Sequence, residues 1–120
     1  MPSEERIEGL IARVERGEFV EAIEEFYAED ATMQENQQAP RVGRPALVAN
    51  ERAVLAAFEK TQARCVRPVF VSGDEIVIHW LFEFSANGVA VRLDELAHQR
   101  WQGDSIVEER FFYDPVQLRP

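Results

Sequence analysis

Residues 75–101 read "EIVIHWLFEFSANGVAVRLDELAHQRW" and decide the fold class of this chain. Large apolar side chains stand at every second position of the first half, which is the period of a β-strand. They are Ile76, Ile78, Trp80, Phe82 and Phe84. The Asn87-Gly88 pair is a strong hairpin signal, so the two halves are predicted to form an antiparallel strand pair.

The opposite face of the first predicted strand is also partly apolar. It carries Val77, His79, Leu81 and Glu83. A sheet with apolar side chains on both faces is either covered twice or joined to a second subunit. We therefore expect a homodimer that forms through the outer face of the sheet.

Strands continue on both sides of this hairpin, and helices precede them. "CVRPVFVS" (65–72) and "IVEERFFYD" (106–114) read as strands, with Pro68 marking an edge or a bulge. Upstream, apolar stripes of helical period run from Ile7 to Val14 and from Phe19 to Tyr27, and Pro45 suits the start of a third helix. This order predicts an α+β fold in which a curved antiparallel sheet wraps three N-terminal helices as a cone.

Length and composition limit the classes of function. The 120 residues, 46% of them hydrophobic, predict a single domain over residues 1–120. A formal net charge of −9 argues against nucleic acid and against anionic membrane surfaces as partners. The polar start is unlike a signal peptide, and the lone Cys65 suits a reducing compartment. We expect a cytoplasmic protein that does not bind membranes.

Four segments together resemble the NTF2-like superfamily, in its SnoaL-like and ketosteroid isomerase-like branch. They are "RGEF" (16–19), "FYAEDATMQEN" (26–36), "PRVGRPALVANE" (40–51) and "RWQGDSIVEERFFYD" (100–114). The resemblance spans nearly the whole chain and implies an α+β barrel of the cystatin-like type. It is weak for any one activity, because this scaffold carries isomerases, cyclases, dehydratases, hydrolases and noncatalytic binders.

The resemblance also implies a position for a catalytic base. In steroid isomerases the base follows an Asp-Ala-Thr and precedes a Pro-Arg-x-Gly segment, and this registration places Glu35 there. The family's oxyanion-stabilising tyrosine falls near Leu10 and its protonated aspartate near Ala97, and neither side chain donates a hydrogen bond. Loss of one such donor typically costs ~2.7–4 kcal/mol, so the sequence argues against classical steroid isomerase activity.

Strand alternation predicts which side chains face the inside of the cone. If Ala97 faces inward, then Glu95, Gln99, Trp101, Glu109, Phe111 and Tyr113 do as well. Glu35, Glu95, Glu109 and Tyr113 are the predicted catalytic residues. The predicted ligand-binding residues are Asn50, Phe58, Trp80, Phe82, Trp101 and Phe111. Apolar walls with a few polar groups are typical of a small-ligand site.

Each of these residues has a simpler interpretation. A register slip of one position would put Glu95 and Glu109 in water, and Arg92, Arg100 or Arg110 would otherwise pair with them. Glu35 and Asn50 would be surface residues, and Tyr113 and the tryptophans would be core. His79 and His98 fall on the outer face as packing residues of the dimer. No motif predicts a metal site, a nucleotide or another cofactor.

Two functions therefore remain. The first is cofactor-independent acid/base catalysis, of an isomerase, cyclase or dehydratase type, on a small hydrophobic carbonyl compound. Glu35 would abstract a proton, Glu95 or Glu109 would return one, and Tyr113 or Asn50 would hold the oxygen. The second is a noncatalytic module that binds a small hydrophobic molecule or only dimerises. A cavity with two carboxyl groups near one ligand atom would favour catalysis.

Overall fold

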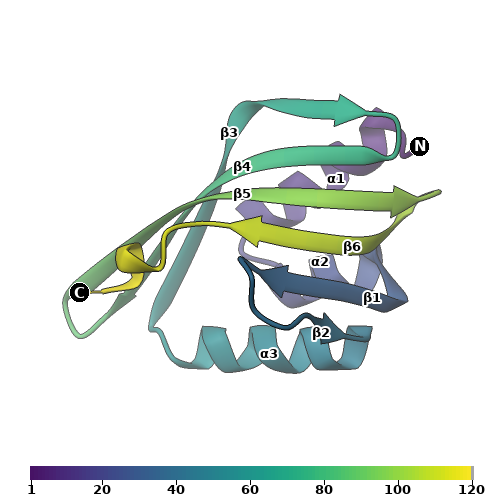
Figure 1. Cartoon of the computed structure of the whole chain (residues 1–120). Coiled ribbons are helices and arrows are strands. Elements are labelled where there is room, and N and C mark those ends of the chain that lie inside the picture. The colour runs from purple at the N-terminus through teal and green to yellow at the C-terminus, as the bar shows by residue number, and fades with distance from the viewer. Residues whose placement is uncertain (120) are drawn as a thin grey trace.

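The computed structural model describes residues 1–119, and within them three α-helices pack on one face of a six-stranded sheet (Figure 1). The helices are α1 (Glu4–Glu15), α2 (Phe19–Phe26) and α3 (Arg44–Ala56). The strands are β1 (Tyr27–Glu35), β2 (Arg41–Val42), β3 (Lys60–Ser72), β4 (Glu75–Ala86), β5 (Val89–Gln102) and β6 (Ser105–Phe112), and a short 3₁₀-helix, η1 (Pro115–Leu118), follows. No helix in this range is long and apolar enough to cross a membrane.

The sheet is mixed rather than wholly antiparallel. Its strand order is β2-β1-β6-β5-β4-β3, and the hairpins from β3 to β6 are antiparallel as predicted. However, β1 pairs with β6 in parallel, with Glu35 opposite Phe111. Residues 36–104, with α3 and four strands, separate β1 from β6, so no hairpin joins the two strands and a parallel pair is possible. The α+β class and the curved sheet are as predicted.

Burial along β5 follows the predicted alternation. From Leu93 to Trp101 every second residue is buried and the residues between them are exposed. Glu95 and Glu109 are only 6% and 3% exposed, so the inward register holds and the one-residue slip does not occur. The irregularity that Pro68 predicts is also present, because the β3–β4 register shifts between Val66 and Phe70.

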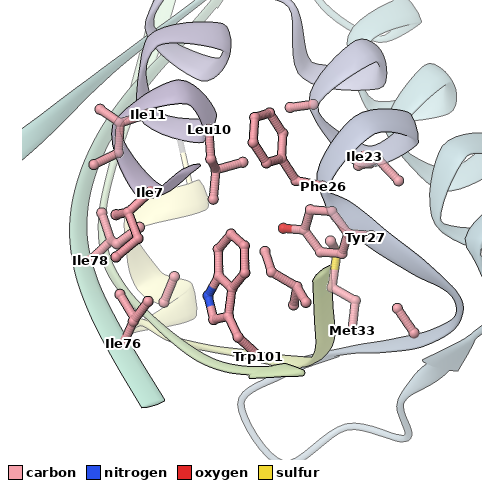
Figure 2. Close-up of a cluster of buried hydrophobic side chains, with 14 of the residues drawn as sticks. Ile7, Leu10, Ile11, Ile23, Phe26, Tyr27, Met33, Ile76, Ile78 and Trp101 are labelled. Carbon is pink, nitrogen blue, oxygen red and sulfur yellow. The ribbon is translucent and has the colours of Figure 1, made fainter. Parts of the chain in front are cut away.

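The core lies between α1, α2 and the centre of the sheet (Figure 2). Leu10 and Ile11 from α1 pack toward Trp101 of β5, which is 1% exposed. Tyr27 differs from its predicted place on a helical stripe: α2 ends at Phe26, and Tyr27 takes an extended backbone as the first residue of β1. Figure 2 shows its hydroxyl group pointing into the cluster.

Helix α3 is placed by a glycine. Gly43 precedes the helix with φ 93° and donates its backbone N–H to the Ala31 carbonyl oxygen at 2.8 Å. This backbone conformation strongly favours glycine, since a Cβ atom makes it strained. The resulting direction of α3 turns Leu47, Glu51 and Val54 toward the sheet, at the spacing of one helical face.

Candidate functional site

Three adjoining chambers run between the helices and the sheet within the described part of the chain. The inner chamber has a volume of about 70 Å³, the middle one about 110 Å³ and the outer one about 480 Å³. Phe19, Met33, Glu51, Phe82 and Phe111 line both the inner and the middle chamber. The middle and outer chambers share Glu35, Val54, Phe84 and Leu93. The chambers therefore form one tapering, mostly apolar hollow.

Four carboxyl groups from four elements face this hollow. Glu35 at the end of β1, Glu51 on α3 and Glu95 on β5 line the middle chamber. Glu109 on β6 lines the inner chamber, which Glu51 also reaches. The predicted acids Glu35, Glu95 and Glu109 are thus brought to one interior, together with a fourth.

Glu109 is held by two hydrogen bonds at the inner end. Its Oε1 accepts from the Tyr27 hydroxyl group, and its Oε2 accepts from Gln99 Nε2 at 2.7 Å. Gln99 is itself fixed because its Oε1 accepts from Trp101 Nε1 at 3.0 Å. Burial raises the pKa of Glu109 to about 7, although these two donors act in the opposite direction. Burial and the charge of Glu109 raise the pKa of Tyr27 well above its ordinary value.

Glu95 has no such partners. Within residues 1–119 its carboxyl group makes no hydrogen bond or ion pair, although the residue is 6% exposed. Its oxygens are therefore open to the middle chamber, which the side chain lines. Burial, followed by the charges of Glu109, Glu35 and Glu51, raises the pKa of Glu95 to about 8. The group is mainly a neutral carboxylic acid at pH 7.

Glu51 was not among the predicted site residues. Burial and the charge of Glu35 raise the pKa of its carboxyl group, and Arg41 only partly opposes this shift. The sequence held one signal, namely an acid on or beside the apolar stripe of the third helix. Its meeting with Glu95 could not be foreseen, because it depends on how α3 crosses the sheet.

Glu35 is oriented by two neighbours. Arg41 Nη1 donates to its Oε2 at 3.1 Å, and the Tyr113 hydroxyl group donates to its Oε1 at 3.1 Å. Burial and the adjacent charge of Glu35 raise the pKa of Tyr113 to about 12, so the phenol stays protonated and remains a donor. Arg41, on the two-residue strand β2, was also absent from the predicted site.

The predicted ligand-binding residues divide among the chambers. Asn50, Phe82 and Phe111 line the middle chamber, Trp80 lines the inner one, and Phe58 lines the outer one with Tyr113. Trp101 lines none of these three chambers; it lies in the core and is linked to the site by its hydrogen bond to Gln99. Leu10 and Ala97, where the family has its two donors, are both buried.

The arginines that could have paired with the inner acids bind elsewhere. Arg92 pairs with Glu83, Arg100 pairs with Glu108, and Arg110 donates to the Asn36 carbonyl oxygen. The two histidines have carboxylate partners at the sheet surface: His79 Nε2 lies 2.6 Å from Asp94 and His98 Nε2 lies 2.9 Å from Glu75. In residues 1–119 no group of three or more His, Cys, Asp or Glu side chains is arranged to hold a metal ion.

Comparison with solved structures shows the same fold. A protein described as a SnoaL-like polyketide cyclase from Jannaschia sp. CCS1 superposes with a TM-score of 0.79 at 13% identity, over 94% of this chain and 88% of that one. TerC, co-crystallised with polyporic acid, superposes with a TM-score of 0.80 at 15% identity, over 95% and 92% of the two chains.

A third structure is a protein of ketosteroid isomerase-like fold from Catenulispora acidiphila DSM 44928, in complex with trimethylamine. Its TM-score is 0.77 at 17% identity, over 93% of this chain and 87% of that one. A comparison with curated proteins found no significant match. At such identities a shared structure establishes the fold and leaves the activity open. Residues 7–109 match the family model of the SnoaL-like domain, and this chain therefore belongs to that family.

Proposed function

We propose that this chain is a cofactor-independent acid/base catalyst that moves a proton within a small, largely apolar carbonyl compound. One observation carries the proposal: the middle chamber brings Glu35 and Glu95, two carboxyl groups in different environments, to the same apolar space. Carboxyl groups whose surroundings separate their pKa values can divide the roles of base and acid.

In this mechanism Glu35 abstracts the proton from the carbon next to the carbonyl group. Arg41 and Tyr113 hold the carboxylate in one orientation, and Tyr113 can turn its hydroxyl group toward an oxygen of the substrate. Negative charge then develops on the carbonyl oxygen. Glu95, protonated and without a partner, donates a hydrogen bond to that oxygen, and Asn50 lines the same chamber.

Glu95 supplies an acidic donor two residues from Ala97, on the same inward face of β5. It can therefore take over, from a different position, the work of the donors that the family has near Leu10 and Ala97. Return of the proton to a second carbon gives an isomerisation, and attack of the enolate on a second carbonyl carbon gives a cyclisation. The polyketide cyclase description of a structural neighbour supports this range of chemistry.

Proton abstraction can be tested without knowing the product. We expect the protein to catalyse exchange of α-protons for deuterium in a panel of apolar ketones in D₂O, followed by NMR. Glu35→Gln removes the base with little change in shape and should lower the exchange rate roughly 10²–10⁴-fold. Glu24→Gln, an exposed acid of α2, is the matched control and should keep the full rate.

Equal exchange by the wild type and Glu35→Gln would contradict the proposal. Ketones that bind and raise the melting temperature, with no exchange above the uncatalysed rate, would instead make the chain a noncatalytic binder.

We also propose a homodimer through the outer sheet face. Leu96 and Phe112 are opposite one another on β5 and β6, and both are more than two-fifths exposed. Phe70 on β3 is 62% exposed and pairs with Val77 of β4. Such a surface loses unfavourable contact with water when a second copy covers it.

A further inference from the structure

The interior of the cone has more acids than cations. Arg41 is the basic side chain among the residues that line the middle chamber, and it already pairs with Glu35 at 3.1 Å. Glu51, Glu95 and Glu109 then remain without a cation inside residues 1–119. Bringing three carboxyl groups together in an apolar space is costly unless something compensates them, and each has a raised pKa as a result.

Two of these acids are unpartnered and face the cavity. The Glu95 side chain is only 6% exposed. Its carboxyl group makes no hydrogen bond within the described residues. Glu51 likewise has no hydrogen-bonding partner there, and it lines both the inner and the middle chamber. A carboxyl group that the protein encloses without supplying a hydrogen-bond donor can accept one from a ligand in the chamber.

We propose that the space between Glu51 and Glu95 binds the protonated amino group of a small organic ligand whose apolar part lies against the surrounding phenylalanines. An ammonium group has several N–H donors, so it can satisfy both carboxyl groups at once. Glu109, fixed by Tyr27 and Gln99, adds negative charge on the inner side of this space.

The walls of the hollow suit an organic cation. Phe19, Phe82 and Phe111 line both chambers that Glu51 reaches. The faces of aromatic rings attract cations, and the attraction strengthens where water is excluded. The same rings also bury the carbon skeleton of the ligand. Charge and shape therefore favour an apolar amine over an inorganic ion.

The affinity should depend on pH in a defined direction. The titratable and charged side chains that face the chambers are Tyr27 and Glu35 on β1, Arg41 on β2, Glu51 on α3, Glu95 on β5, Glu109 on β6 and Tyr113 after it. Bound ammonium favours ionised carboxylates, so it should displace about one proton at pH 6, where Glu95 and Glu109 are mostly protonated. Affinity should rise from pH 5 to pH 8.

Binding of an ammonium group here does not require that the chain catalyse a reaction. One ammonium group compensates one carboxylate charge, so Glu109, already fixed by Tyr27 and Gln99, can keep its proton. Failure of the binding test leaves the exchange test of proton abstraction unaffected, and the reverse is also true.

Three probes that share one ring but differ in charge test the proposal: benzylammonium, benzyl alcohol and benzoate. We expect benzylammonium to bind at least about tenfold more tightly than the alcohol at pH 8, as charge-assisted hydrogen bonds imply. Dissociation constants come from ligand-detected NMR. Calorimetry in buffers of different ionisation enthalpy gives the number of protons released.

Variants locate the bound cation. Glu51→Gln and Glu95→Gln should each remove most of the preference for benzylammonium while leaving benzyl alcohol unchanged, and Glu24→Gln should keep it. The proposal is overturned if benzyl alcohol or benzoate binds as tightly as benzylammonium, or if both inner variants behave like Glu24→Gln. It is also overturned if calcium chloride at equal concentration displaces benzylammonium, since the site would then take an inorganic cation.

Discussion

At the scale of single residues, the environment of Glu95 explains most of what the site can do. It is an acid on an inward position of a central strand, in a mostly apolar hollow whose walls include several phenylalanines. With no donor to stabilise its charge, the carboxyl group keeps its proton to about pH 8. The same isolation that makes it a proton donor also makes it a weak point for stability at high pH.

Replacing Glu95 with Gln should therefore stabilise the fold increasingly as the pH rises. The carboxyl group titrates near 4.5 when unfolded and near 8 when folded. Below pH 4.5 both states hold the proton, so Glu95 has no effect. Between pH 4.5 and 8 only the unfolded state ionises, and the free energy of unfolding falls. Gln does not titrate, so the variant should gain roughly 1–3 kcal/mol at pH 8.

Urea denaturation at pH 5 and at pH 8 measures this difference. Glu24→Gln, which lies in solvent, should show no gain at either pH. A Glu95→Gln variant that is destabilised equally at both pH values would mean that the carboxyl group is ionised and satisfied in the folded protein.

At the scale of elements, α3 decides which acids meet. Its position follows from Gly43, whose positive φ turns the chain from β2 into the helix, and from the Leu47 side chain, which is buried against the sheet. Without that turn Glu51 would not line the chambers that Glu95 and Glu109 also line. The geometry of the site therefore depends on a residue that touches none of the acids.

Gly43→Ala should destabilise the protein by roughly 1–3 kcal/mol because alanine is strained at φ 93°. A Cβ atom there would lie 3.9 Å from Pro45 Cδ, which is an ordinary contact, so the cost is conformational rather than steric. Urea denaturation measures the loss. Gly103→Ala, at φ 61° in the β5–β6 turn, should also lose stability, but only Gly43→Ala should weaken the binding of benzylammonium.

That comparison separates the position of α3 from stability in general. If Gly43→Ala binds benzylammonium as tightly as Gly103→Ala does, the direction of α3 does not control the site.

At the scale of the whole molecule, the sheet has two different faces. The inner face meets the helices and encloses the acids, whereas the outer face exposes Phe70, Leu96 and Phe112 beside the His79–Asp94 and His98–Glu75 pairs. The chain has a net charge of −9, so two copies repel one another at long range. Association through this face must therefore rest on apolar contact.

Light scattering coupled to gel filtration should give a mass near twice 13.8 kDa for the wild type. Leu96→Arg places a charge in the centre of the apolar surface and should return the mass to that of one chain. Val42→Arg, at an apolar and still more exposed position on the edge strand β2, should leave the dimer intact. A wild type that runs as one chain at high concentration would refute the interface.

The sequence by itself determined the four hairpin-linked strands of the second half and the faces of their side chains. Alternation from Ile76 to Phe84 and from Leu93 to Trp101 is a local property, because successive side chains of any strand point to opposite faces. It was therefore enough to place Glu95 and Glu109 on the inner face of the sheet. The likeness of four short segments to one superfamily was enough to predict the α+β class.

Only the tertiary structure decided which residues lie next to those acids. The parallel pairing of β1 with β6, the change of Tyr27 from a helical to a strand residue, and the approach of Glu51 all depend on contacts between distant parts of the chain. Arg110, next to Glu109 in sequence, faces the other side of the sheet because neighbours along a strand point to opposite faces, but its partner, the Asn36 carbonyl oxygen, comes from a distant part of the chain. Local pattern fixes where a side chain points, and long-range packing fixes its partner.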